Sequence, residues 1–162
     1  MITNNQKINP IINRARVARL ATVDSKAMPY LVPVVFAFDG EKYYIPVDEK
    51  TKTTKPDKLR RIKNIEINPA VALLIDEYSE DWKKLLFIMI QGKASILGKR
   101  RGNKKEEEEQ QENDENDKLL KIAHKLLFAK YTQYQHIAIG KLCIVIYPQK
   151  TIFWSMVSKE NQ

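Results

Sequence analysis

Short, mainly apolar segments separated by polar turn residues recur along the chain, and this pattern predicts β-strands. The predicted strands are residues 17–23, 29–38, 42–47, 71–75, 87–97, 143–147 and 151–154. Asp39-Gly40 lies between the second and third segments and is a strong hairpin signal. Pro33 and Pro46 fall inside strands, so each marks an edge, a bulge or an opening in the sheet. Six or seven antiparallel strands predict a small barrel.

Three other segments carry apolar residues at helical spacing. The first is predicted to begin at Asn9-Pro10, as N-cap and N1, and to end near Arg16. The others cover residues 56–67 and 117–129. The expected fold class is therefore mainly β, a barrel with flanking helices.

Length and composition favour a single globular domain over residues 1–162. The chain has 162 residues, of which 43% are hydrophobic. The longest apolar run, residues 85–90, is far below the roughly 20 residues of a membrane span. Polar residues follow Met1 at once, which gives no sign of a signal peptide. The single cysteine, Cys143, excludes an internal disulfide framework and is predicted to be buried. We expect a cytoplasmic protein that does not bind membranes.

Residues 98–118 form a low-complexity stretch with six positive and eight negative side chains, a net charge of −2. No apolar residue interrupts it, so we expect a surface insertion that folds onto no core. A solvated loop and a functional acidic segment both remain open interpretations.

The whole chain has a formal net charge of +8, so the residues outside 98–118 carry +10. The densest basic stretch is residues 50–63, with seven cations against Asp57. One interpretation is a solvated helix face. The other is a phosphate site, because the stretch follows a predicted strand and opens a helix whose N-terminus favours anions. A patch this concentrated suits one or two phosphates better than a long polyanion, which argues against nucleic acid.

Motifs for nucleotide phosphates, serine nucleophiles and zinc proteases are absent from the sequence. Neither His124 nor His136 has a cysteine or carboxylate at metal-ligand spacing, and we interpret His124 as structural. If the protein is an enzyme, we expect a bound cofactor to supply its chemistry.

Two consecutive segments resemble the pyridoxamine-phosphate-oxidase-like split barrels: RVARLATVDSKAMPYLVPVVFAFDGEKYYIPVDEK and LRRIKNIEINPAVALLIDEYSEDW. They are most similar to the branch of deazaflavin (coenzyme F-420)-dependent oxidoreductases. The likeness covers residues 5–97 and resumes at KYTQYQ, residues 130–135. It implies a six-stranded antiparallel split barrel of the FMN-binding type. It also implies a homodimer that holds FMN or the deazaflavin coenzyme F-420 at its interface.

The resemblance also implies where the cofactor binds. In this family, basic residues several positions before an Asn-Pro hold the cofactor phosphate. Counting back from Asn68 assigns this role to Arg60 and Arg61, with Asn64 on the next helical turn. Arginine suits the role because its planar fork binds phosphate bidentately. Three further lysines either hold a second charged group or are solvated: Lys50, Lys52 and Lys55.

The cofactor ring is expected against the ends of the second and third strands. The candidates there are Pro33, Val34, Val35, Phe36, Pro46, Val47 and Asp48. Trp82 and Tyr78 either cover the site from the partner subunit or serve in ordinary packing.

The function implied is an oxidoreductase that passes a hydride from the reduced ring to a small organic acceptor. The alternative is a non-catalytic protein, either a cofactor-binding barrel or a basic nucleic-acid-associated one. Tyr43 and Tyr44 are the only aromatic pair near the basic stretch, and in a strand only one of them can point outward.

Overall fold

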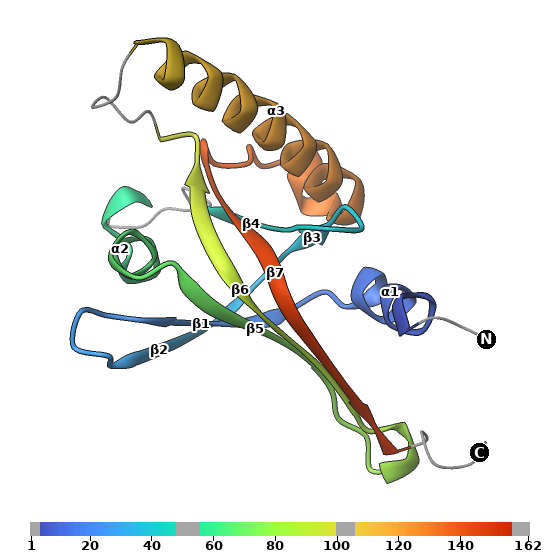
Figure 1. Ribbon diagram of the computed structural model, residues 1–162. Helices are drawn as coiled ribbons and strands as arrows, with labels where there is room; N and C mark the ends of the chain where they lie inside the picture. Colours follow the sequence, from blue (N-terminus) through green and yellow to red (C-terminus); the bar gives the residue numbers. More distant parts are fainter. Residues whose placement is uncertain (1–3, 48–55, 100–105, 157–162) are drawn as a thin grey trace.

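The computed structural model describes residues 4–47, 56–99 and 106–156, which form one curled antiparallel sheet with helices around it (Figure 1). The strands are β1 Ala18–Val23, β2 Pro29–Val34, β3 Ala37–Phe38, β4 Tyr43–Val47, β5 Ala70–Glu77, β6 Leu86–Leu97 and β7 Leu142–Ser155. Their order in the sheet is β2-β1-β5-β6-β7-β4-β3. The predicted mainly β split-barrel class is confirmed, with six longer strands and the two-residue β3.

The helices are α1 Asn4–Arg14, α2 Arg60–Ile67 and α3 Glu106–Lys130, with short 3₁₀ turns η1 Pro56–Lys58, η2 Trp82–Lys84 and η3 Thr132–Gln135. The predicted start of the first helix is wrong, because α1 begins at Asn4 and Pro10 lies inside it. Proline removes one helical hydrogen bond, and burial of Ile8, Ile11 and Ile12 in the core offsets that cost. None of the described helices is both long and apolar enough to cross a membrane.

Apolar clusters lie on both faces of the sheet. Inside the barrel, Ile144 and Ile146 of β7 pack with residues of α1, α2 and the other strands. On the outer face, Cys143 and Val145 pack with Tyr44 under α3. Strand residues alternate between faces, so the unbroken apolar run at the start of β7 serves both faces. The predicted burial of Cys143 is confirmed.

The expectation of a surface loop at residues 98–118 is wrong for its second half. Residues 106–118 form the first turns of α3, which continues through the apolar segment that packs on the sheet. Glutamate, glutamine and lysine have high helix propensity, so a helix nucleated on the core can extend through them without an apolar face. Figure 1 shows this half of α3 projecting beyond the strands.

The predicted strand at 29–38 divides at residues 35 and 36, and its two parts lie at opposite edges of the sheet. β2 pairs with β1, whereas β3 pairs with β4. The link between them therefore crosses from one edge of the curled sheet to the other. The hydroxyl of Tyr131 accepts a hydrogen bond from the Phe36 N–H (3.1 Å) and points its proton at the carbonyls of Arg16 (2.8 Å) and Phe36 (2.9 Å). Burial raises the pKa of Tyr131, which keeps this donor protonated.

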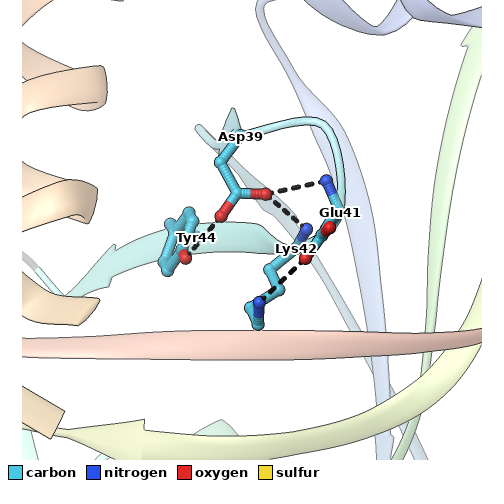
Figure 2. Close-up of polar contacts among 4 residues, drawn as sticks. All are labelled: Asp39, Glu41, Lys42 and Tyr44. Atoms are coloured by element: carbon cyan, nitrogen blue, oxygen red, sulfur yellow. Dashed lines mark hydrogen bonds and ion pairs between the residues drawn. The ribbon is translucent and has the colours of Figure 1, made fainter. Parts of the chain in front are cut away.

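The predicted hairpin at Asp39-Gly40 is present between β3 and β4 (Figure 2). The Asp39 carboxylate accepts hydrogen bonds from the backbone N–H groups of Glu41 (2.8 Å) and Lys42 (2.6 Å) and from the Tyr44 hydroxyl (2.7 Å). Burial opposes ionisation of Asp39, but these bonds outweigh it and the pKa of Asp39 is lowered. The same carboxylate thus satisfies the hydroxyl of the fully buried Tyr44.

The two strands predicted at 143–147 and 151–154 are one continuous strand, β7, paired with β6 along its length. Pro148 does not break it, because the register shifts beside Gly92 and leaves Pro148 opposite that glycine. A Cβ at position 92 would collide with the carbonyl of Tyr147, so this bulge requires glycine.

Replacement of Tyr131 by phenylalanine is expected to lower the free energy of unfolding by about 1–3 kcal/mol, because it leaves buried backbone groups without their partner. Urea unfolding measures this. Tyr78→Phe is the matched control, since its hydroxyl bonds Glu80 at the surface, and it should change stability by less than about 0.5 kcal/mol. Equal effects of the two substitutions would show that the Tyr131 hydroxyl does not hold the link.

Candidate functional site

The start of α2 gathers the basic residues that the sequence assigned to a phosphate. Arg60 is exposed, and its guanidinium lies 5.8 Å from the ring centroid of Tyr30 on β2. Arg61 is half-buried next to it. The N-cap residue Leu59 offers the first turn no side-chain hydrogen bond. An anion at this position would take the place of the missing cap.

Asn64, one turn further along α2, points into the protein. Its side chain is 3% exposed and donates a hydrogen bond to the hydroxyl of Thr22 on β1 (3.0 Å). The sequence placed Asn64 with the cofactor-binding residues, and its observed contact fixes α2 against β1. That contact sets the position of Arg60 and Arg61 relative to the sheet.

The predicted ring-binding residues surround the link between β2 and β3. Pro33 is exposed on β2, the outermost strand at one edge of the sheet. The side chains of Val34 and Val47 are buried in the barrel core, so any contact of theirs with a cofactor would run through the backbone. Val35 is half-buried and faces a pocket.

Two strand edges next to this link have free sides. β3 pairs only with Tyr43 and Tyr44 of β4, so residues 45–47 of β4 have no strand on that side within the described part of the chain. Proline at position 46 removes one donor from this edge. The sequence predicted that Pro33 and Pro46 each mark an edge, a bulge or an opening in the sheet. Pro33 lies on β2 at one edge of the curled sheet, and Pro46 lies on the uncovered part of β4 near the other edge.

Four predicted site residues lie outside the described residues: Asp48, Lys50, Lys52 and Lys55. Trp82 is described, but it belongs to η2, in the connection between β5 and β6. In Figure 1 this connection lies at the other end of the sheet from α2. Trp82 is 63% exposed and Tyr78 is 72% exposed, so neither packs in the core of its own chain. A single chain does not bring them together with Arg60.

The sequence did not identify a pocket of about 260 Å³ between the start of β1, the β2–β3 link and η3. We call it the Arg16 pocket, and its lining includes Arg16, Val35, Tyr131, Gln133, Tyr134 and Ile137. A signal was present in the sequence, since Lys130 and Tyr131 directly follow the apolar segment of the predicted last helix. Tyr131 lines this pocket only together with Arg16, which lies 114 residues away from Lys130 along the chain.

Two cations and two aromatic rings pack together beside this pocket. The Arg16 guanidinium lies 4.4 Å from the ring centroid of Tyr131, and its Nη1 donates to the carbonyl of Lys130 (2.6 Å). The Lys130 ammonium lies 4.0 Å from the ring centroid of Phe36. Burial and the nearby charge of Arg16 lower the pKa of Lys130 to about 8. The positive charges are thus held close together at some electrostatic cost.

The histidines show no catalytic arrangement in the described residues. Nε2 of His124 lies 3.3 Å from the carbonyl oxygen of Gly140, which agrees with a structural role. His136 is exposed beyond η3.

Comparison with known proteins gives a family and a fold. The family model described as pyridoxamine 5'-phosphate oxidase matches residues 5–138. The sequence matches no curated protein at a significant level.

Solved structures agree with this fold. A conserved hypothetical protein of Mycobacterium tuberculosis is 17% identical with a TM-score of 0.67, over 100% of this chain and 92% of its own. An FAD-binding protein of Mesorhizobium loti is 16% identical with a TM-score of 0.57, over 91% of each chain. The heme storage protein HutZ of Vibrio cholerae is 16% identical with a TM-score of 0.53, over 92% of each chain. At these identities the likeness shows the fold, and the fold serves more than one ligand.

Proposed function

Because the chain belongs to the pyridoxamine 5'-phosphate oxidase family, we propose that it is an oxidoreductase that binds FMN or the deazaflavin coenzyme F-420. The phosphate binds at the start of α2 and the ring lies along the β2–β3 link. The bound ring supplies hydride transfer to a small organic acceptor.

The observation that carries this proposal is the charge at the start of α2. Lys58, Arg60 and Lys63 enter no ion pair among the described residues, and Asp57 is the one carboxylate among residues 57–63. With Arg61 they surround a helix N-terminus that lacks a side-chain cap. Phosphate satisfies both features, because it carries negative charge and accepts several hydrogen bonds.

In the proposed site, the protein's own groups bind and orient the cofactor. Arg60 and Arg61 hold the phosphate, and the Asn64–Thr22 bond keeps their helix against the sheet. The free edges of β2 and β4 offer backbone donors and acceptors to the polar edge of the ring. No side chain has to act as acid or base, since solvent can exchange the proton.

The alternatives are non-catalytic binding of the same cofactor and binding of nucleic acid. Tyr43 and Tyr44 are 2% and 0% exposed, so neither ring is available for base stacking beside the basic stretch. This supports a small-molecule ligand. A protein that binds flavin but reduces no acceptor would favour the non-catalytic cofactor-binding alternative.

Fluorescence titration with FMN, and separately with F-420, tests the site. The double variant Arg60→Ala with Arg61→Ala should bind FMN about a hundredfold more weakly, because it loses charged hydrogen bonds to the phosphate. Riboflavin, which has no phosphate, should bind wild type and variant equally.

Lys121→Ala with Lys125→Ala is the matched control, because it removes the same charge from exposed positions of another helix. It should leave FMN affinity unchanged. Wild type that prefers FMN no more than riboflavin would show that α2 does not hold a phosphate.

We further propose a homodimer with the cofactor at the interface. Trp154 stacks on Phe87 at 5.8 Å and is 42% exposed. Together with the exposed Trp82 and Tyr78 it forms an aromatic surface at the end of β5, β6 and β7. A partner would bury this surface and bring Trp82 to the cofactor.

Sedimentation equilibrium should therefore give twice the 18.9 kDa mass of the chain. A monomer at micromolar concentration would contradict the dimer.

A further inference from the structure

Three arginines lie at the junction of α1 and β1, and only one of them lacks a carboxylate partner among the described residues. Arg14 pairs with Glu77 and Arg19 pairs with Asp76, both at 2.8 Å. Arg16 instead faces the pocket, and among the described residues its guanidinium makes one hydrogen bond, from Nη1 to the carbonyl of Lys130. A guanidinium has five N–H donors, so several remain for a ligand.

Lys130 adds a second positive charge beside Arg16. Its ammonium contacts the carbonyl of Ile12 (3.4 Å) and the ring of Phe36, and it too has no carboxylate partner among the described residues. Two adjacent cations without a counter-ion favour an anion beside them.

The other residues that line the pocket limit the size and polarity of the rest of that anion. Val35, Ile137 and the rings of Tyr131 and Tyr134 present apolar surface, and Gln133 adds one amide. A volume of about 260 Å³ lies just below the roughly 300–1,000 Å³ range of ligand pockets. The space suits a single ring or short chain with one acidic group. A carboxylate matches the planar fork of Arg16.

We propose that the Arg16 pocket binds the carboxylate of a small unsaturated organic acid, and that this acid is the acceptor in the reaction: a double bond in its body takes a hydride from the reduced cofactor ring and a proton from solvent, and the ring is left oxidised. The assignment as acceptor rests on the proposed function, because it uses Val35, which lines the pocket and was also predicted to contact the cofactor ring. The acid's carboxylate lies on Arg16 and its apolar body reaches toward Val35.

Benzoate is the probe, with benzamide as its neutral counterpart, and calorimetry measures both affinities without cofactor. Wild type should prefer benzoate. Arg16→Gln should weaken benzoate binding about tenfold and abolish the preference, since it removes a charged bidentate contact. Arg14→Gln, a neighbour already paired with Glu77, should leave the preference intact. Equal affinity of wild type for the two probes would overturn the carboxylate site.

A second variant separates loss of the site from loss of the fold. Ile137 is 47% exposed at the pocket, so Ile137→Trp fills the space without removing core packing. It should abolish benzoate binding while unfolding in urea as wild type does. Unchanged benzoate affinity in Ile137→Trp would place the probe elsewhere and overturn the proposal.

The role as acceptor is tested with FMN bound. Benzoate should bind together with FMN and shift the visible absorption of the flavin, and Arg16→Gln should keep the wild-type affinity for FMN. Displacement of FMN by benzoate would assign the pocket to the cofactor and overturn the acceptor role. Benzoate binding in a protein that binds neither FMN nor F-420 would leave the carboxylate site standing and refute the proposed function.

Discussion

The hydroxyl of Tyr131 satisfies the backbone where the chain crosses between the two edges of the sheet, and the surrounding architecture depends on that contact. A strand that leaves one edge of a sheet and joins the other must interrupt its hydrogen bonds at the crossing. Here the crossing is at Phe36, and Tyr131 bonds both its N–H and its C=O while also reaching the carbonyl of Arg16. One buried side chain thus fixes the end of α3, the start of β1 and the β2–β3 link. The Arg16 pocket lies where these segments meet.

This crossing leaves open backbone beside the link, although the residues that the structure describes hold no catalytic side-chain constellation. The free strand edges lie next to the link because the barrel is split there. The cations of α2 lie at the other end of β2, where Arg60 covers Tyr30. An extended ligand with a phosphate at one end and a planar ring at the other fits this arrangement of charge and open backbone, which is the basis of the proposed cofactor site.

Much of the fold could be predicted from the sequence, because local signals and tertiary packing agree in most segments. The apolar runs of the strands, the Asp39-Gly40 turn and the end of α2 at Ile67 depend on near neighbours, whereas the predicted start of that helix at residue 56 is wrong, because residues 56–58 form the separate turn η1. The division of β2 from β3 could not be predicted, since residues 29–38 are equally apolar throughout and the break depends on Tyr131, 95 residues away from Phe36. The length of α3 was missed because helix propensity, without an apolar face, was enough to extend a helix already packed on the core. At the site, Arg60 and Arg61 followed from charge and from family likeness, whereas the Arg16 pocket is formed by segments distant in sequence.

The proposed cofactor site requires one ligand to extend from the start of α2 to the β2–β3 link. Amide chemical-shift mapping of isotope-labelled protein during titration with FMN tests it most directly. We expect the largest shifts at Tyr30, at Arg60 and Arg61, and at Val35 and Phe36, with the exposed face of α3 unchanged. Shifts concentrated on α3, with none at Arg60 or Val35, would contradict it.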